Sequence, residues 1–240
     1  MSSNFYLEGT PDEVKNAKGL HLVTMSTPNG KKVQIMLEEL KAAYGTECNE
    51  CHLESSKDWF LKLNPNGRIP ILIDNTKTPP FPVMETSAEL LYLLKEFDSK
   101  DMFGFKDELE RNECLQWLFF WHGSGAPREE SRLVAIRQIY AQHLTNAGGY
   151  IEALERFKNE TLRVFGVLEI RLSGKYTGEP REYLAGNGKG KYSVADIGTW
   201  HNLHEALEDM NAFPHVLKWI DRIAERPAVQ SGTAKRWQNW

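Results

Sequence analysis

The sequence contains little cysteine and no long apolar run. Its 240 residues include three cysteines, an odd number that argues against a disulfide framework and suits a reducing compartment. No segment approaches the roughly 18 consecutive apolar residues that a membrane-spanning helix needs, and the N-terminal region lacks the apolar core of a signal peptide. We therefore expect a cytoplasmic protein that does not bind membranes.

Positive charge is not in excess either. There are 29 Lys and Arg residues against 33 Asp and Glu residues, so the formal net charge is −4, and no basic cluster stands out along the chain. These features argue against a nucleic-acid partner. A hydrophobic content of 41% is that of an ordinary globular protein, and the length allows one large domain or two small ones.

The junction between an expected strand and an expected helix is the most informative feature that is present. Residues 20–25 form a short β-rich run, and over residues 29–44 apolar side chains recur at helical spacing. Thr27 fits the N-cap of this helix, and Pro28 fits its first position. Because a helix N-terminus presents free N–H groups and a partial positive charge, we expect an anion to bind at this junction.

The rest of the chain divides into two patterns. Strands and helices alternate up to residue 98, and from about residue 107 the pattern is helical throughout. The expected strands are 20–25, 48–54, 68–74 and 81–84; the expected helices are 29–44, 86–97, 108–122, 128–146, 150–173, 194–209 and 214–226, with a short helix or loop at 55–63. Pro82 places its strand at a sheet edge, because proline cannot donate to a neighbouring strand.

This pattern predicts four parts. They are an N-terminal extension (1–18) on the surface or against a partner subunit, an α/β domain (19–98), a helical domain (107–232) and a C-terminal tail (233–240).

Three local signals concern structure more than chemistry. Ser193 and Asp196 predict a capping box at the start of a helix. The glycine-rich run 186–191 lacks the spacing of a phosphate-binding loop and is interpreted as a loop. His201 and His204 have a spacing compatible with metal binding, but no third ligand accompanies them in a clear motif, and we expect no metal.

The chain resembles the cytosolic glutathione transferases over nearly its whole length. The residues that carry the resemblance are Asn64–Pro70, Met84–Ser87 with Leu90–Leu93, Ser193–Asp196 and Trp219–Val229. More narrowly, residues 27–40, Trp117–Trp121 and Ala126–Pro127 are similar to the Nu class and its relatives, which include bacterial disulfide-bond reductases, fungal transferases and the yeast nitrogen-catabolism regulator. The resemblance implies a thioredoxin-like N-terminal domain (α/β) followed by an all-helical (all-α) C-terminal domain, and a homodimer.

The resemblance also implies glutathione as the anionic ligand. Ile69 would pair its backbone with the cysteinyl part of glutathione, next to Arg68 and a cis Pro70; the alternative is an ordinary trans proline. Glu85 would receive the glutathione ammonium and Thr86 its carboxylate.

Two further positions bear on this ligand set. Thr86 with Glu89 also forms a capping-box pattern, so Thr86 could serve only as a cap. Glu89 departs from the apolar residue usual at its position and could repel the incoming carboxylate. Arg156 matches an arginine that reaches the glutathione carboxylate in the subgroup; the alternative is a solvated charge.

Thr27 and Asn29 are the expected catalytic residues, because they could hold the glutathione thiol as a thiolate. Lowering a thiol pKa by about two units requires ~2.7 kcal/mol of selective thiolate stabilisation. The helix dipole supplies roughly 0.3–1 kcal/mol, and one or two hydrogen bonds to the charged sulfur, each worth roughly 1.5–3 kcal/mol, supply the remainder. The alternative is that both residues only shape the turn.

No cysteine lies at this junction, which argues against a protein thiolate that forms a mixed disulfide. Cys48 and Cys51 fall in the following strand, where residues three apart point to opposite faces, so they are not expected to be a redox pair. Cys114 is interpreted as a core residue.

Four aromatic residues of the helical region are candidates for the pocket of a second substrate, although apolar helix faces more often form a core. They are Trp117, Phe120, Trp121 and Trp200. The second substrate would be a small disulfide or a small electrophile. We favour disulfide-bond reductase activity over transferase activity; the alternative is a non-enzymatic glutathione-binding or regulatory protein, because a fold does not fix a function.

Overall fold

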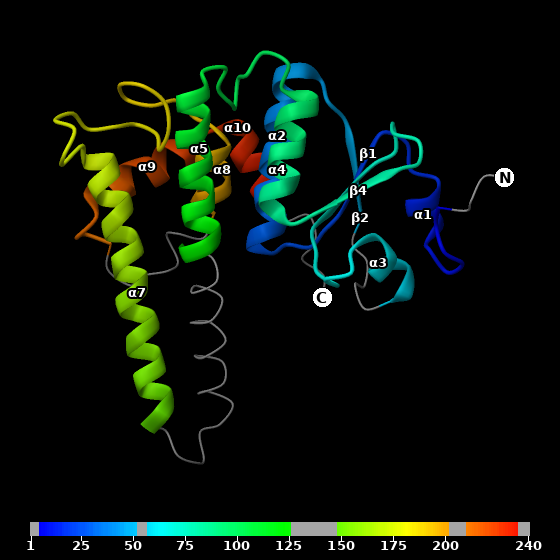
Figure 1. Cartoon of the computed structure of the whole chain (residues 1–240), viewed down its shortest axis with the longest axis horizontal. Coiled ribbons are helices and arrows are strands. Elements are labelled where there is room, and N and C mark those ends of the chain that lie inside the picture. The colour runs from blue at the N-terminus through cyan, green and yellow to red at the C-terminus, as the bar shows by residue number, and fades with distance from the viewer. Residues whose placement is uncertain (1–4, 52–56, 126–147, 202–209, 235–240) are drawn as a thin grey trace. The chain divides into compact units, whose positions relative to one another are not determined.

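A computed structural model of the chain describes residues 5–51, 57–125, 148–201 and 210–234 (Figure 1). Contacts between residues divide the chain into two compact units, Met1–Met102 with Glu225–Trp240 and Phe103–Ala224. The expected helix at 128–146 lies outside the described residues, as do parts of the expected segments 48–54, 194–209 and 233–240.

The first unit is built on a mixed sheet of four strands in the order β2-β1-β3-β4. The strands are β1 (Leu20–Val23), β2 (Cys48–Cys51), β3 (Ile71–Asp74) and β4 (Phe81–Met84). β2 is parallel to β1, whereas β3 is antiparallel to both β1 and β4. β4 is an edge strand, as Pro82 predicted.

Helices cover both faces of this sheet (Figure 1). They are α1 (Asp12–Lys15), α2 (Pro28–Tyr44), α3 (Asp58–Leu63), α4 (Thr86–Phe97) and α10 (Pro227–Thr233). Side chains alternate along a strand, so Val23 and Ile71 face α3 and form a buried cluster with Trp59 and Phe60. α2 packs against α4, and α10 packs against α2. This is the thioredoxin-like fold that the resemblance implied.

Part of the N-terminal segment packs on the core of this unit. Val14 of α1 is 0% exposed, and Phe5 and Tyr6 pack against the same buried cluster. The Tyr6 hydroxyl also donates to Asn75 Oδ1 at 2.8 Å. Three apolar side chains of this segment therefore pack on their own unit, while most of its other side chains are exposed. Contact of the segment with a partner subunit stays a prediction.

The second unit is helical in all its described parts except for turns and one isolated β-bridge. Its elements are α5 (Glu108–Phe120), the π-helical turn η1 (Trp121–Gly125), α7 (Gly148–Ser173), α8 (Val194–Trp200) and α9 (Pro214–Ala224). α5 packs against α8, and α7 packs against α9. The capping box predicted at Ser193 and Asp196 is confirmed. None of the described helices combines the length and apolarity needed to cross a membrane.

Candidate functional site

Three segments that are distant in sequence meet at one end of the sheet. Val23 of β1 lies beside Ile71 of β3, and Ile71 lies beside Met84 of β4. The chain leaves β1 after Val23, enters β3 through Pro70 and leaves β4 toward Glu85. This end of the sheet therefore collects the segments that carry seven of the predicted site residues: Thr27, Asn29, Arg68, Ile69, Pro70, Glu85 and Thr86.

Thr27 is the N-cap of α2, as the sequence predicted. Its backbone is extended, with φ −110° and ψ 161°, and its Oγ1 accepts a hydrogen bond from the Gly30 N–H at 3.2 Å. Pro28 occupies the first turn, where its missing N–H is no loss. The Thr27 hydroxyl hydrogen is not used in this bond, so the side chain can cap the helix and still donate to a ligand.

Lys32 adds positive charge to the start of α2, beyond the partial charge of the helix N-terminus. The first turn contains no acidic residue, and Lys32 follows within one turn. Lys32 is 4% exposed, and its Nζ donates to Asn29 Oδ1 at 3.4 Å. This bond uses the oxygen of the Asn29 amide and leaves its N–H groups for another acceptor. A buried lysine beside the predicted thiol ligand was not foreseeable, because burial is a property of the tertiary structure.

The turn before β3 presents the backbone of Ile69. The Ile69–Pro70 peptide bond is cis, which confirms the prediction made from the family motif. Asn64 holds the turn, because its Nδ2 donates to Arg68 O at 2.6 Å and its Oδ1 accepts from Asn66 N at 3.0 Å. Among the described residues, no hydrogen bond engages the backbone of Ile69. That backbone is therefore free to pair with an extended ligand. Arg68 is exposed.

Glu85 and Thr86 lie at the start of α4. Glu85, not Thr86, is the N-cap residue, so the alternative that Thr86 only caps this helix is wrong. Glu85 has φ +74°, a left-handed angle that costs a residue with a Cβ roughly 1–2 kcal/mol. Its exposed carboxylate accepts from Asn66 Nδ2 at 3.1 Å. Thr86 is the first helical residue and is 7% exposed.

Glu89 lies one turn into α4 and is completely buried. Neither of its carboxyl oxygens has a hydrogen-bond partner among the described residues. Burial, and secondarily the nearby Glu85, raise the pKa of Glu89 well above its usual value. A neutral acid does not repel a carboxylate, so the charge repulsion considered from the sequence does not operate while Glu89 stays protonated.

None of the three cysteines lies at the start of α2, and all three are free. Burial raises the pKa of the Cys51 thiol to about 12 and that of Cys114 to about 11, and it also raises the pKa of Cys48. Thiols with such pKa values are not ionised at neutral pH and are poor nucleophiles. Cys114 is 3% exposed, which confirms its interpretation as a core residue.

The remaining candidates belong to the second unit. The rings of Trp117 and Phe120 meet edge to face with centroids 5.7 Å apart, and the Arg171 guanidinium lies 5.3 Å from the Trp117 ring. Trp121 and Trp200 are 3% and 5% exposed. Their place in a substrate pocket stays a prediction.

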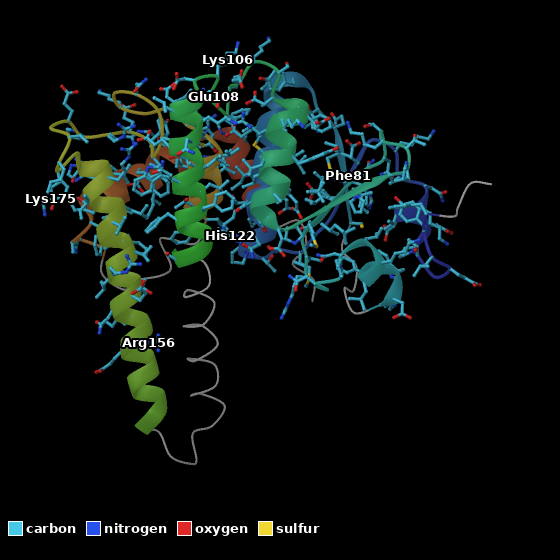
Figure 2. All side chains as sticks on the ribbon, viewed as in Figure 1. Phe81, Lys106, Glu108, His122, Arg156 and Lys175 are labelled. Carbon is cyan, nitrogen blue, oxygen red and sulfur yellow. The ribbon has the colours of Figure 1, made fainter. Side chains whose placement is uncertain are left out.

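Arg156 is exposed on α7 (Figure 2). It lines a shallow hollow together with Glu160 and Arg163. Its role in ligand binding also stays a prediction. His204 lies outside the described residues, and no group of three potential metal ligands occurs within them.

Comparison with known proteins identifies the family of the chain. Residues 22–101 match the family model described as the N-terminal domain of glutathione S-transferase. The Escherichia coli protein named disulfide-bond oxidoreductase YghU is 32% identical over 231 residues, which cover 89% of this chain and 73% of that protein. This chain belongs to the glutathione transferase superfamily.

Solved structures of proteins named as glutathione transferases or their homologues share its fold and contain glutathione or glutathione disulfide. A homologue from Lodderomyces elongisporus, crystallised with two glutathione molecules per subunit, superimposes with a TM-score of 0.74 at 30% identity and covers 90% of this chain and 98% of its own. A transferase from Pseudomonas putida holds one glutathione disulfide per subunit; its TM-score is 0.74 at 27% identity, with 92% and 93% of the two chains covered.

Proposed function

We propose that this glutathione transferase binds glutathione at the described end of its sheet and uses the glutathione thiolate to reduce disulfide bonds. The observation that carries the proposal is the start of α2, where Thr27, Asn29 and Lys32 gather hydrogen-bond donors and positive charge but no protein thiol. The name of the E. coli relative, and the glutathione disulfide in the P. putida structure, favour this chemistry.

In the proposed complex the cysteinyl part of glutathione extends the sheet by pairing with the free backbone of Ile69. The carboxylate of Glu85 binds the glutathione ammonium. Thr86 binds the adjacent carboxylate with its hydroxyl and N–H, where the N-terminus of α4 favours an anion. Arg68 and Arg156 are proposed to add positive charge at the carboxylates.

The proposed reaction proceeds in two exchanges. The thiolate of one glutathione attacks a disulfide sulfur, which forms a glutathione mixed disulfide and releases one thiolate. A second glutathione thiolate attacks the mixed disulfide, so that glutathione disulfide and the second thiol leave. Thr27 and Asn29 donate hydrogen bonds to the attacking sulfur and lower its pKa, and Lys32 adds to the positive potential.

The substitution Thr27→Val combined with Asn29→Ala tests the role of these donors. If they stabilise the thiolate, the double variant loses at least about tenfold in kcat/KM for reduction of hydroxyethyl disulfide, and its pH profile shifts to higher pH. Unchanged turnover in the double variant contradicts the proposal.

A variant without protein thiols tests the source of the nucleophile. The triple change Cys48→Ser, Cys51→Ala and Cys114→Ala should keep the reductase activity, provided that thermal unfolding shows a folded protein at the assay temperature. Loss of activity in this folded variant would identify a protein cysteine as the nucleophile instead.

Conjugation of glutathione to an electrophile is the second candidate, because the solved neighbours are named glutathione transferases. It would use the same thiolate, with Trp117, Phe120, Trp121 and Trp200 as the proposed pocket for the second substrate. Comparing rates with hydroxyethyl disulfide and chlorodinitrobenzene ranks the two activities. Glutathione binding without turnover of either compound would favour the non-enzymatic alternative. A homodimer is also proposed, and light scattering tests it.

A further inference from the structure

Helix α9 gathers basic side chains on one of its faces. His215, Lys218 and Arg222 stand at positions i, i+3 and i+7, so they lie on the same side of the helix. The side turned away from them is apolar and includes the buried residues Val216 and Ile220. Like charges four residues apart, as at Lys218 and Arg222, destabilise a helix unless an anion lies between them.

A loop of the same unit brings further basic side chains to this face. Arg181 and Lys189, from the connection between α7 and α8, line a hollow together with the three residues of α9. Pro180 and Glu182 complete its lining, and its volume is about 340 Å³. This volume lies within the range of small-molecule sites. The chain as a whole carries a net charge of −4, so the positive charge of the hollow is local.

Protein carboxylates neutralise only part of this charge. Glu182 Oε1 accepts from Lys189 Nζ at 3.2 Å, and Glu169 Oε1 lies 2.6 Å from His215 Nδ1, which leaves Nε2 as the other ring nitrogen. The other three basic groups, Arg181, Lys218 and Arg222, have no carboxylate within ion-pair distance among the described residues.

The two arginines are held by neutral groups. Arg222 Nη1 donates to the carbonyl of Glu182 at 2.9 Å, and its guanidinium lies 5.8 Å from the Tyr183 ring centre. Arg181 donates to the carbonyls of Tyr183 and Gly186. Burial, and secondarily the positive charge of Arg171, lower the pKa of Arg181. These contacts fix the guanidinium groups without cancelling their charge.

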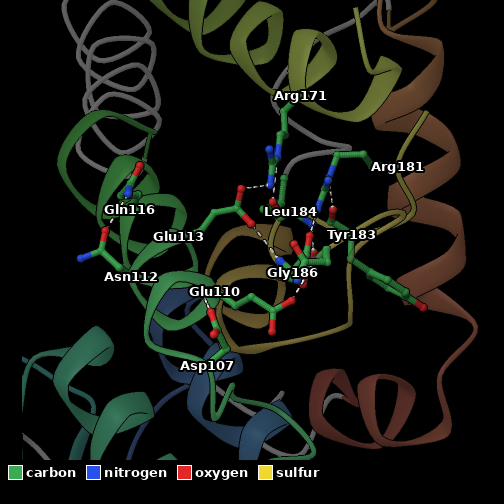
Figure 3. Close-up of polar contacts among 12 residues, drawn as sticks. Asp107, Glu110, Asn112, Glu113, Gln116, Arg171, Arg181, Tyr183, Leu184 and Gly186 are labelled. Carbon is green, nitrogen blue, oxygen red and sulfur yellow. Dashed lines mark hydrogen bonds and ion pairs between the residues drawn. The ribbon is translucent and has the colours of Figure 1, made fainter. Parts of the chain in front are cut away.

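The loop is anchored, so the hollow is formed before any ligand arrives. Figure 3 shows Glu113 of α5 bound to Arg171 and accepting from the Gly186 N–H at 2.9 Å. Arg171 Nε donates to Leu184 O at 2.8 Å, and the Leu184 N–H donates to Asp196 at 3.0 Å. A preorganised site loses less conformational entropy when it binds a ligand.

We propose that this hollow is a second binding site, distinct from the glutathione site, for a small molecule that carries at least two phosphate or carboxylate groups. Guanidinium groups recognise both anions through paired hydrogen bonds, and the unpaired Lys218 supplies a further charge. If the proposal of this second site fails, the proposed glutathione chemistry is unaffected, because the two sites share no residue.

Titration calorimetry of the full chain with inorganic pyrophosphate and with citrate tests the proposal. In low salt, we expect at least one of the two to bind saturably, one per chain, with weaker binding as salt is added. Saturating glutathione should leave this binding in place. Absence of saturable binding, or complete displacement by glutathione, would overturn the proposal.

Variants identify the site. Lys218→Gln with Arg222→Gln should weaken the binding by about tenfold or more. The single change Lys218→Glu serves the same purpose without removing a contact of the folded chain. The control is Lys106→Gln with Lys175→Gln, two exposed lysines outside the hollow (Figure 2). Equal weakening by the control pair would show that only net charge matters, and would also overturn the proposal.

Discussion

At the scale of single residues, two side chains near the candidate glutathione site depart from what a local pattern can indicate. Lys32 is buried beside Asn29, and Glu89 is buried without a partner for either carboxyl oxygen. Burial of a charged group without a partner is costly, so the neutral acid is the form of Glu89 that this position favours. The contribution of Glu89 to the stability of the protein therefore depends on pH.

The substitution Glu89→Gln should stabilise the protein by an amount that grows with pH. Because the folded-state pKa of Glu89 is raised, its acid form contributes stability that is fully present below the unfolded-state pKa and is lost as pH rises toward the folded-state pKa. Glutamine has no such dependence. The variant should therefore differ least from the parent near pH 4 and most near pH 8, with about 2–4 °C in Tm for each kcal/mol.

Thermal unfolding at several pH values provides the measurement. The matched control is Glu108→Gln, the same chemical change at an exposed position (Figure 2), measured at the same pH values. A Glu89→Gln variant whose stability relative to the parent does not rise with pH would contradict a buried neutral acid.

The residues that sequence reasoning placed correctly are those whose roles are local. Thr27 caps α2 because a cap needs only the side chain and the next three residues. The cis Pro70 was predicted by a family motif and not by propensity. The burial of Lys32 and Glu89 was not predicted, because it depends on elements that are distant in the chain. The hollow lined by Arg181 and Arg222 was missed for the same reason.

At the scale of elements, Asp196 connects the start of α8 to two other parts of its unit. The box itself is local, since the Ser193 N–H and hydroxyl lie 3.0 and 3.2 Å from Asp196 Oδ2. Two further donors come from a distance: the Leu184 N–H at 3.0 Å and Trp219 Nε1 at 2.9 Å. Burial nevertheless raises the pKa of Asp196 to about 6. The sequence predicted the box but not these longer connections.

The substitution Asp196→Ala should therefore cost more than the loss of a cap. We expect a decrease of about 3 kcal/mol or more in the free energy of unfolding, because buried donors lose their acceptor. The comparison variant Ser193→Ala removes the capping hydroxyl, which also accepts from the Cys114 thiol at 3.7 Å, and should cost about 1 kcal/mol. Urea unfolding measures both; equal costs would show that the bonds from Leu184 and Trp219 contribute nothing.

Gly30 determines how closely α2 begins against the end of β1. A Cβ at this position would collide with Met25 O and Thr24 Oγ1. Gly30→Ala should destabilise the protein by about 1–3 kcal/mol and weaken glutathione binding, because the turn that carries Thr27 must move.

Gly166→Ala is the control for this change. Its Cβ would meet no atom within 4 Å, and alanine should stabilise α7 by up to about 1 kcal/mol. Denaturant unfolding and glutathione titration test both variants. If Gly30→Ala binds glutathione as tightly as the parent does, the turn that carries Thr27 does not take part in glutathione binding.

At the scale of the whole molecule, the last described residues belong to the same compact unit as the first ones. The sequence predicted Pro227 only as the end of a helix, but Pro227 also starts α10, which packs on α2. Glu39 and Arg226 form a bidentate salt bridge with N–O distances of 2.7 and 2.9 Å. Lys31 Nζ donates to Ala234 O at 2.8 Å. A helix of seven residues gives little periodic signal, so only its packing reveals its role.

Packing of α10 on α2 therefore connects the last described residues to the helix that begins at Thr27. Gly232 makes the closest approach, since a Cβ there would lie 2.7 Å from Ile35 Cα. Gly232→Val should displace α10, cost about 2–3 kcal/mol and increase amide hydrogen exchange along α2. Gln230→Val introduces the same residue at an exposed position and should do neither. If both variants left exchange in α2 unchanged, the order of α2 would depend on the sheet and α4 alone, and α10 would be dispensable to the candidate glutathione site.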